Sequence, residues 1–168
     1  MGKTTDLRRV IRQNFIPYMK ERGFHPDLRH MPRLLDFRRI TPQQIFVCDI
    51  QWEKYGRPRF VLNFGSCGPH GVICHGEQIN PTDVTPSVTP RQGRLQPGRS
   101  ASVSNWFRQN RGLLQRIWKG SRLKPPDEVV RNLIELFPEV ENYWENGTIG
   151  EHVRLHPVRW SADRDNPS

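Results

Sequence analysis

Three stretches between Arg33 and Gly65 alternate residue by residue between two kinds of position, and this pattern constrains the fold more than any other feature. In RLLDFRRI, Leu35 and Phe37 alternate with polar residues. In QIFVCDIQWE and RFVLNFG, one set of alternate positions is apolar, namely Phe46, Cys48, Ile50 and Trp52, then Phe60, Leu62 and Phe64. Successive side chains of a strand point to opposite faces, so this pattern predicts an antiparallel sheet with one buried face.

An amphipathic helix is predicted before the strands, from Thr5 to Arg22. Its apolar residues recur three and four positions apart, and Gly23 ends it. Pro17 lies inside the helix and is expected to bend it or to remove one hydrogen bond. We expect this helix to cover the aromatic face of the sheet.

Two more helical segments are predicted in the C-terminal part of the chain. Apolar residues recur at roughly helical spacing from Val103 to Lys119. A second segment has Pro126 in its first turn and stops at Gly147. The sequence GEHVRLHPVRW can add an edge strand. No repeat is evident, so we expect one α+β domain over residues 1–160 and a polar tail over residues 161–168.

A long stretch rich in Gly, Pro, Thr and Ser runs from Gly65 to about Ser102. Its segment INPTDVTPSVTPRQGRLQPGRS holds four prolines, which argues against a long helix or a central strand. A loop of this length is unusual inside a domain and is often functional or mobile. The predicted fold class is therefore α+β, with an antiparallel sheet, helices packed on one face, and a long Pro/Gly-rich loop.

The chain is strongly basic, with a formal net charge of +9 and a pI of about 10.2. Its charges are unevenly placed. Residues 101–125 carry six basic and no acidic groups, whereas residues 126–152 carry seven acidic groups and one basic group. Such a positive field favours polyanions such as nucleic acid, or acidic proteins. The competing interpretation is a basic protein with no such partner.

Cysteine usage and hydropathy bear on the compartment. The three cysteines are an odd number, no signal peptide precedes them, and no apolar run approaches the length of a membrane span. We therefore expect a cytoplasmic protein with reduced thiols and no membrane association. The sequence indicates no cofactor, and it leaves the oligomeric state open.

The first candidate site is the stretch GSCGPHGVICHGE. Cys67, His70, Cys74 and His75 are residue types that bind zinc, but their spacing matches no standard zinc finger. Cys67 could instead act as a nucleophile with His70 or His75 as base, although only Glu77 is suggested as the carboxylate that would orient the base. The interpretation favoured by the sequence is a sharp turn, in which glycines and Pro69 redirect the chain.

The second candidate site is the sheet face opposite the aromatic residues. Arg38, Asp49, Gln51 and Asn63 come from three neighbouring strands and could converge there. A carboxylate, two amides and a guanidinium would form a polar pocket. The competing interpretation is a solvated face, which antiparallel sheets commonly have.

The third candidate site combines aromatic and basic residues. Its members are Arg57, Arg59, Trp106, Arg108 and Arg111, with Trp52, Tyr55, Phe107 and Trp118 as further aromatic residues. Such a set could stack on bases and contact phosphates. The competing interpretation places the aromatic rings in the core and leaves the arginines as solubilising groups.

Several stretches together resemble a bacterial family catalogued as domain of unknown function 4304. They are IPYMKERGF, LLDFRRI, DIQWEKYGRPRFVLNFG, RQGRL followed by WF, and FPEVENYWENGTIGEHV. The resemblance covers most of residues 5–155, except the loop around Pro81–Pro90. It implies a compact intracellular α+β domain, brings no activity, cofactor or catalytic residue, and does not extend to the cysteines and histidines of the first candidate site.

The sequence thus favours a non-catalytic binding module whose partner is acidic, either nucleic acid or an acidic protein. The alternative is a hydrolase-type or metal-dependent enzyme that uses the Cys67–His75 loop.

Overall fold

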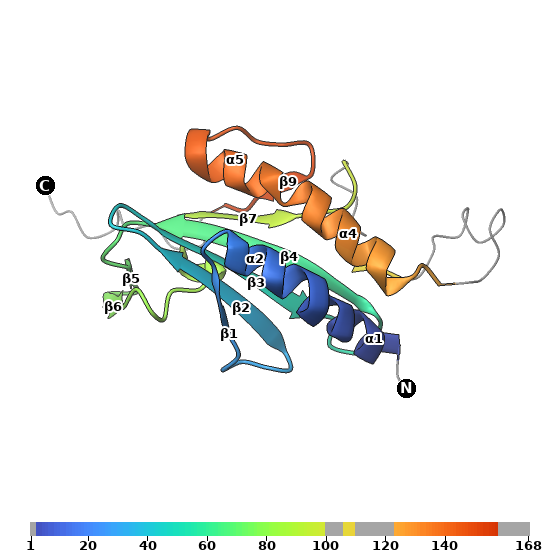
Figure 1. Ribbon diagram of the computed structural model, residues 1–168. Coiled ribbons are helices and arrows are strands. Elements are labelled where there is room, and N and C mark those ends of the chain that lie inside the picture. Colours follow the sequence, from blue (N-terminus) through green and yellow to red (C-terminus); the bar gives the residue numbers. More distant parts are fainter. Residues whose placement is uncertain (1–2, 100–105, 110–122, 158–168) are drawn as a thin grey trace, which may run out of the picture.

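The computed structural model describes residues 3–99, 106–109 and 123–157 (Figure 1). The helical elements are α1 (Lys3–Val10), η1 (Ile11–Phe15), α2 (Ile16–Glu21), η2 (Pro86–Val88), α4 (Pro126–Leu136) and α5 (Pro138–Asn146). The strands are β1 (His25–Asp27), β2 (Leu34–Ile40), β3 (Ile45–Trp52), β4 (Arg59–Cys67), β5 (Val72–Cys74), β6 (Glu77–Ile79), β7 (Arg91–Leu95), β8 (Phe107–Arg108) and β9 (Val153–Leu155). The predicted tail over residues 161–168 lies outside this part of the chain.

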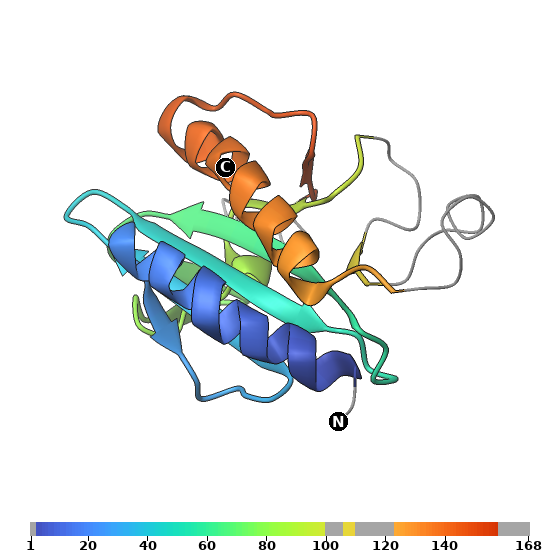
Figure 2. The same cartoon turned by 45° about the vertical axis from the view of Figure 1, so that its right-hand side comes forward.

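Seven of these strands form one antiparallel sheet in the order β1-β2-β3-β4-β7-β9, and β8 also pairs with β4. Strands β5 and β6 form a separate hairpin. The helix from α1 to α2 and the pair α4 and α5 lie on the same face of the sheet (Figure 1 and Figure 2). The predicted antiparallel sheet with helices on one face is confirmed, and β9 is the predicted edge strand.

The aromatic positions on the strands face the helices, as the alternation predicts. Phe60 and Phe64 are fully buried, and Trp52 is 7% exposed. Phe46 departs from the expected burial beneath the first helix. It is only partly buried, and its ring packs on Trp144 of α5 at 5.1 Å between centroids.

Phe137, at the junction of α4 and α5, is the centre of the aromatic core. Its side chain is fully buried. Its ring meets Phe15, Tyr18, Phe24 and Trp144 edge to face, with centroid separations of 5.9 to 6.2 Å. Edge-to-face pairs place the positive edge of one ring against the negative face of the next. Phe137 therefore joins the C-terminal helices to the N-terminal helix and to the chain that enters the sheet.

The N-terminal helix passes from α1 through η1 into α2, and η1 is a π-helical turn just before Pro17. Proline has no N–H, so the carbonyl of Gln13, four residues earlier, lacks its α-helical donor. In the widened turn, the N–H of Ile16 bonds to the carbonyl of Ile11, five residues earlier. The bend predicted at Pro17 is therefore a local widening of a continuous helix.

The second predicted segment forms the two helices α4 and α5, with Pro126 and Gly147 at the predicted start and stop. Pro126 and Pro138 each lie in the first turn of a helix, where an N–H has no intrahelical partner. Gly147 ends α5 in the left-handed conformation, with φ of 78°. The hydroxyl of Tyr18 donates to the carbonyl of Ile134 at 3.2 Å, which links α2 to α4.

Strand β7 lies within the predicted long loop. It lies between β4 and β9, so the expectation that this stretch holds no central strand was wrong. Pro90 and Pro97 flank the strand and no proline lies inside it, so no donor of the ladder is missing. Gly93 lies opposite Phe64, whose ring would be 2.6 Å from an added Cβ.

The prediction of a helix from Val103 to Lys119 is wrong for residues 106–109, the part of this segment that the structure describes. Phe107 and Arg108 form β8 and pair with Phe60 and Arg59. The rings of Phe107 and Phe60 stack at 5.3 Å between centroids. Roughly helical spacing of aromatic residues does not distinguish a helix from a short strand that buries one ring, because tertiary packing decides between them. Most of this segment lies outside the described residues.

We expect the Phe137→Ala variant to be severely destabilised. Removing a fully buried ring leaves a cavity among four other aromatic side chains, which costs about 3–5 kcal/mol in the free energy of unfolding. Urea unfolding followed by tryptophan fluorescence measures this loss. Tyr55→Ala serves as the control, because its ring is 70% exposed and its loss should cost less than about 0.5 kcal/mol. Similar losses for both variants would contradict the assignment of Phe137 to the centre of the core.

Candidate functional site

The stretch rich in cysteine and histidine forms a tight turn followed by a hairpin. In the turn, the N–H of Gly71 donates to the carbonyl of Gly68 at 3.2 Å. Strands β5 and β6 follow, joined by His75 and Gly76 with φ of 52° and 79°. Positive φ at both residues of a two-residue loop is the geometry of a type I′ turn, which matches the twist of the paired strands. The predicted sharp turn is confirmed, whereas the hairpin after it was not predicted.

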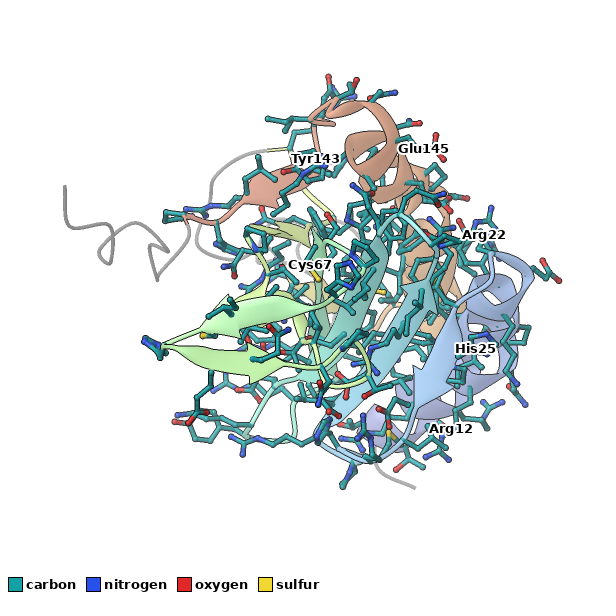
Figure 3. All side chains as sticks on the ribbon, turned by 90° about the vertical axis from the view of Figure 1, so that its left-hand side faces the viewer. Arg12, Arg22, His25, Cys67, Tyr143 and Glu145 are labelled. Atoms are coloured by element: carbon teal, nitrogen blue, oxygen red, sulfur yellow. The ribbon has the colours of Figure 1, made fainter. Side chains whose placement is uncertain are left out.

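The four candidate metal ligands are not gathered into one site. Cys67 is 7% exposed and lies at the base of the hairpin (Figure 3). Cys74 is partly buried, and His70 and His75 are exposed. Within residues 3–99, 106–109 and 123–157, no group of three or more His, Cys, Asp or Glu residues could hold a metal ion.

The thiol of Cys67 is not activated. It packs in a small second core with Ile45, Val47, Val72 and Val84. Burial raises its pKa, and the nearby charge of an arginine offsets this only in part. Nucleophilic cysteines instead have a lowered thiol pKa. The geometry therefore gives no support to thiol chemistry at this position.

A row of polar side chains, called here the polar row, crosses the sheet face opposite the helices. The strand register places Asp27, Asp36, Asp49, Asn63, Arg94 and Arg154 side by side on six neighbouring strands. Cross-strand neighbours on one face have Cβ atoms about 4.5–5.5 Å apart, so the row is continuous. Three carboxylates occupy one end, two guanidinium groups occupy the other end, and an amide lies between them.

Asn63 is the centre of the polar row. Its Nδ2 donates to Asp49 Oδ1 at 2.8 Å and to Gln51 Oε1 at 3.2 Å. Its Oδ1 accepts a hydrogen bond from Arg94 Nε at 3.0 Å. The structure thus brings together three of the four residues proposed for this face, but the guanidinium comes from Arg94. The guanidinium of Arg38 bonds elsewhere.

The prediction for this face did not include Asp36, His30 and Arg94. Asp36 occupies a polar position of an alternating stretch, so the pattern itself could have identified it. His30 lies in the loop before β2, and its Nδ1 is 2.6 Å from Asp36 Oδ2. Arg94 lies on β7, which was assigned to a loop, so no strand register was available to place it beside Asn63.

Asp49 has an unusual protonation equilibrium. Asp49 is 7% exposed, and its burial raises the pKa of its carboxyl group to about 7. The hydrogen bond from Asn63 lowers the pKa, the carboxylate of Asp36 raises it, and the charge of Arg94 lowers it. Burial is the largest of these effects. It raises the pKa because low-dielectric surroundings disfavour the ionised form. Asp49 therefore exchanges a proton near neutral pH.

A second group, called here the basic end, gathers where β3 turns into β4. Arg59 lies opposite Arg108 across the β4–β8 pair, and its guanidinium stacks on the ring of Trp106 at 4.8 Å. Arg57 lies in the adjoining turn. The fold therefore gathers four of the five residues proposed for anion binding, and Arg111 lies outside the described residues.

Tyr55 is the most prominent side chain of the basic end. It is 70% exposed, more than any other large apolar residue in the described part of the chain. Lys54 Nζ lies 4.7 Å from the centre of its ring, and Arg57 Cζ lies 6.0 Å from it. An exposed aromatic ring between two cations is thus held at the tip of the β3–β4 turn.

The carboxylate of Glu53 fixes this turn. It accepts the backbone N–H of Tyr55 at 2.9 Å, the backbone N–H of Arg57 at 3.2 Å, and Arg59 Nη2 at 3.3 Å. Burial raises the pKa of Glu53, but these hydrogen bonds and the charge of Arg59 outweigh it, so the pKa lies below its usual value. Glu53 neutralises one guanidinium and sets the direction of the residues around Tyr55.

The N-terminal helix extends the basic end. Thr4 Oγ1 donates to the carbonyl of Gly56 at 2.7 Å, which places the start of α1 against the turn. Arg8 lies over the ring of Trp52 at 4.6 Å, and Arg12 follows it one helical turn later. Cations from the helix, the turn and β8 therefore surround one end of the sheet.

No family model, curated protein or solved structure matches this chain. In the residues that the structure describes, none of the helices has both the length and the apolar character needed to cross a bilayer.

We expect Gly71→Ala and Gly68→Ala to differ sharply, although both residues belong to the same turn. Gly71 has φ of 85°, and an added Cβ would collide with the carbonyl oxygen of Ile79. Its replacement should lower the free energy of unfolding by more than about 1 kcal/mol. An added Cβ at Gly68 meets no atom within 4 Å, so its effect should stay below about 0.5 kcal/mol. Urea unfolding and hydrogen exchange of the β5–β6 amides check this, and equal effects would contradict the hairpin geometry.

Asp49→Asn should change how stability depends on pH. The folded pKa of about 7 lies above the unfolded value of about 4, so the folded state binds the extra proton between these limits. The contribution of Asp49 is therefore present at low pH and is lost as pH rises through about 7. The variant should gain stability relative to the native chain as pH rises from about 4, with the difference levelling off above about 7.

Urea unfolding over this pH range measures the difference between Asp49→Asn and the native chain. Glu77→Gln, which removes an exposed carboxylate from the hairpin, is the control. A pH-independent difference for Asp49→Asn would show that folding does not raise the pKa of Asp49 above its unfolded value.

Proposed function

We propose that this chain is a non-catalytic module that binds single-stranded nucleic acid through its basic end. The observation that carries the proposal is the exposed ring of Tyr55 between Lys54 and Arg57. Every base offers a flat face on which an aromatic ring can stack, and neighbouring cations contact the phosphates on either side. This proposal narrows the sequence-based prediction of an acidic partner.

The exposed ring favours nucleic acid over an acidic protein. The bases of a nucleic acid offer a regular series of flat rings to Tyr55, which is 70% exposed, whereas an acidic protein surface offers mainly carboxylates to the cations. The basic end also contains a second ring–cation pair, Trp106 with Arg59. The net charge of +9 provides long-range attraction to a phosphate backbone.

The turn that carries Tyr55 supports binding because it is already fixed. Two backbone N–H groups and one guanidinium bond to the carboxylate of Glu53. A ring held on such a turn loses less conformational entropy on binding than one on an unbraced loop. The proposed interaction therefore depends on Glu53 as a positioning residue.

The alternative function, an enzyme that uses the Cys67–His75 loop, has less support. It would require a lowered thiol pKa or a convergent set of ligands. Burial raises the pKa of Cys67, and the described part of this loop contains no such set. The resemblance to domain of unknown function 4304 remains a proposal beside this one, and it assigns no ligand.

Fluorescence anisotropy with a labelled dT oligonucleotide, over a series of salt concentrations, tests the proposal. Tyr55→Ala should weaken binding by about ten-fold or more while leaving the salt dependence unchanged, because it removes stacking and no charge. Arg57→Gln should lower the slope of log affinity against log salt by about 0.7, because one phosphate contact is lost. The two variants thus separate stacking from charge.

Three controls complete the experiment. Tyr55→Phe keeps the ring and should bind like the native chain. Lys20→Gln removes an exposed cation from α2, at the other end of the helix (Figure 1), and should leave both affinity and slope unchanged. Heparin, which has charges but no bases, should bind Tyr55→Ala as well as it binds the native chain. If Tyr55→Ala binds dT normally while Arg57→Gln does not, the partner is recognised by charge alone, as an acidic protein would be.

A further inference from the structure

A hollow of about 380 Å³ lies at the β1 edge of the sheet. Its lining includes Gly23, His25, Asp27, Leu28, Arg38 and Ile40. The volume lies at the lower end of the range of about 300–1,000 Å³ that is usual for small-molecule sites. None of the residues assigned to nucleic-acid binding lines this hollow, which is near the β2–β3 turn, at the opposite end of β3 from the basic end.

The strand register explains why these side chains meet. His25 on β1 lies directly opposite Arg38 on β2, and Asp27 lies opposite Asp36. His25 and Arg38 therefore share the face that points away from the helices, and Ile40 follows Arg38 two positions later on the same face. Figure 3 shows His25 at the outer strand of the sheet.

Arg38 is a fixed cation beside the hollow. Its side chain is 14% exposed, Nη2 donates to the carbonyl of Val84 at 2.7 Å, and Nη1 lies 3.7 Å from Asp27 Oδ2. The second distance is too long for a hydrogen bond. Within the described residues, one of its five N–H donors is thus used in a hydrogen bond, and Nε is buried without a partner.

The carboxylate of Asp27 is already compensated by another arginine. Arg29 Nε donates to Asp27 Oδ2 at 2.8 Å, and the backbone N–H of Arg29 donates to Oδ1 at 3.0 Å. These bonds hold the pKa of Asp27 down to about 2. Arg29 also bonds to Asp83 at 3.2 Å, so its own charge is shared between two carboxylates. Of the two arginines near Asp27 in the described part of the chain, Arg38 makes fewer hydrogen bonds than Arg29.

Two apolar side chains are exposed at the same hollow. Leu28 is 59% exposed and Ile40 is 51% exposed, and both belong to the small set of large apolar residues that are mostly in water in the described part of the chain. A ligand that covers Leu28 and Ile40 removes their apolar surface from water, which favours binding. The hollow thus combines a cation and an imidazole with an apolar wall.

We propose that this hollow binds a small organic carboxylate with an apolar body, with its carboxylate on Arg38 and His25 and its body over Leu28 and Ile40. A planar carboxylate matches the guanidinium fork, and the imidazole N–H supplies a further donor. A monoanion fits better than phosphate, because Asp27 lies 3.7 Å from the same guanidinium and repels added negative charge. This site is separate from the nucleic-acid interaction proposed above.

NMR titration of the 15N-labelled full chain with 4-phenylbutyrate tests this assignment. The amides of His25, Leu28 and Ile40 should shift together in a saturable way. Arg38→Gln should weaken binding by about 10- to 100-fold through loss of a charged hydrogen bond. Ile40→Ser should weaken it by about ten-fold through loss of apolar contact, and this exposed position tolerates the change in the fold.

Matched ligands and a matched variant make the result decisive. The neutral 4-phenylbutanol and inorganic phosphate should bind at least about ten-fold more weakly than 4-phenylbutyrate. Ile73→Ser removes an exposed isoleucine from β5 and should leave binding unchanged. The proposal is overturned if the three amides do not shift, if the alcohol or phosphate binds as tightly, or if Ile73→Ser weakens binding as much as Ile40→Ser.

Discussion

Burial of one aromatic layer between the sheet and the helices determines where the rest of the molecule lies. Phe15, Phe24, Phe37, Phe64 and Phe137 are all fully buried in it. Each ring removes a large area from water, so the face of the sheet that carries them must be covered. The helices α1–α2 and α4–α5 cover that face. The opposite face remains for the chain between β4 and β7, and for polar residues.

The opposite face is divided into two environments. Val84 and Thr89, from the segment before β7, cover the half of the face near the end of β4, where Cys67 and Gly65 lie. The polar row crosses the sheet beside this second core. Asp49 lies at the border and is 7% exposed, and the effect of its burial outweighs the nearby charge of Arg94, so its surroundings disfavour ionisation. The near-neutral pKa of Asp49 is thus a consequence of its burial on this face of the sheet.

Two further groups of basic residues lie toward the rim of the sheet. At one end, the β3–β4 turn and β8 gather Tyr55 and Trp106 with their cations. At the opposite end of β3, the β1 edge combines Arg38 with exposed Leu28 and Ile40. These two places differ in chemistry. The first offers rings and several cations to a polymer, and the second offers one fixed cation and an apolar wall to a small molecule.

The sequence by itself determined the three long strands, the buried aromatic face and the helix before them, because period-two alternation and helical spacing are local patterns. It also indicated the turns that contain Gly71 and Gly147, where the positive φ favours glycine. Only the tertiary structure decided the roles of β7 and β8, since short segments acquire strand geometry from the strand that they pair with. The polar row and the β1 hollow depend on that pairing: Arg94 reaches Asn63, and His25 meets Arg38, through register alone, which no single stretch of sequence records.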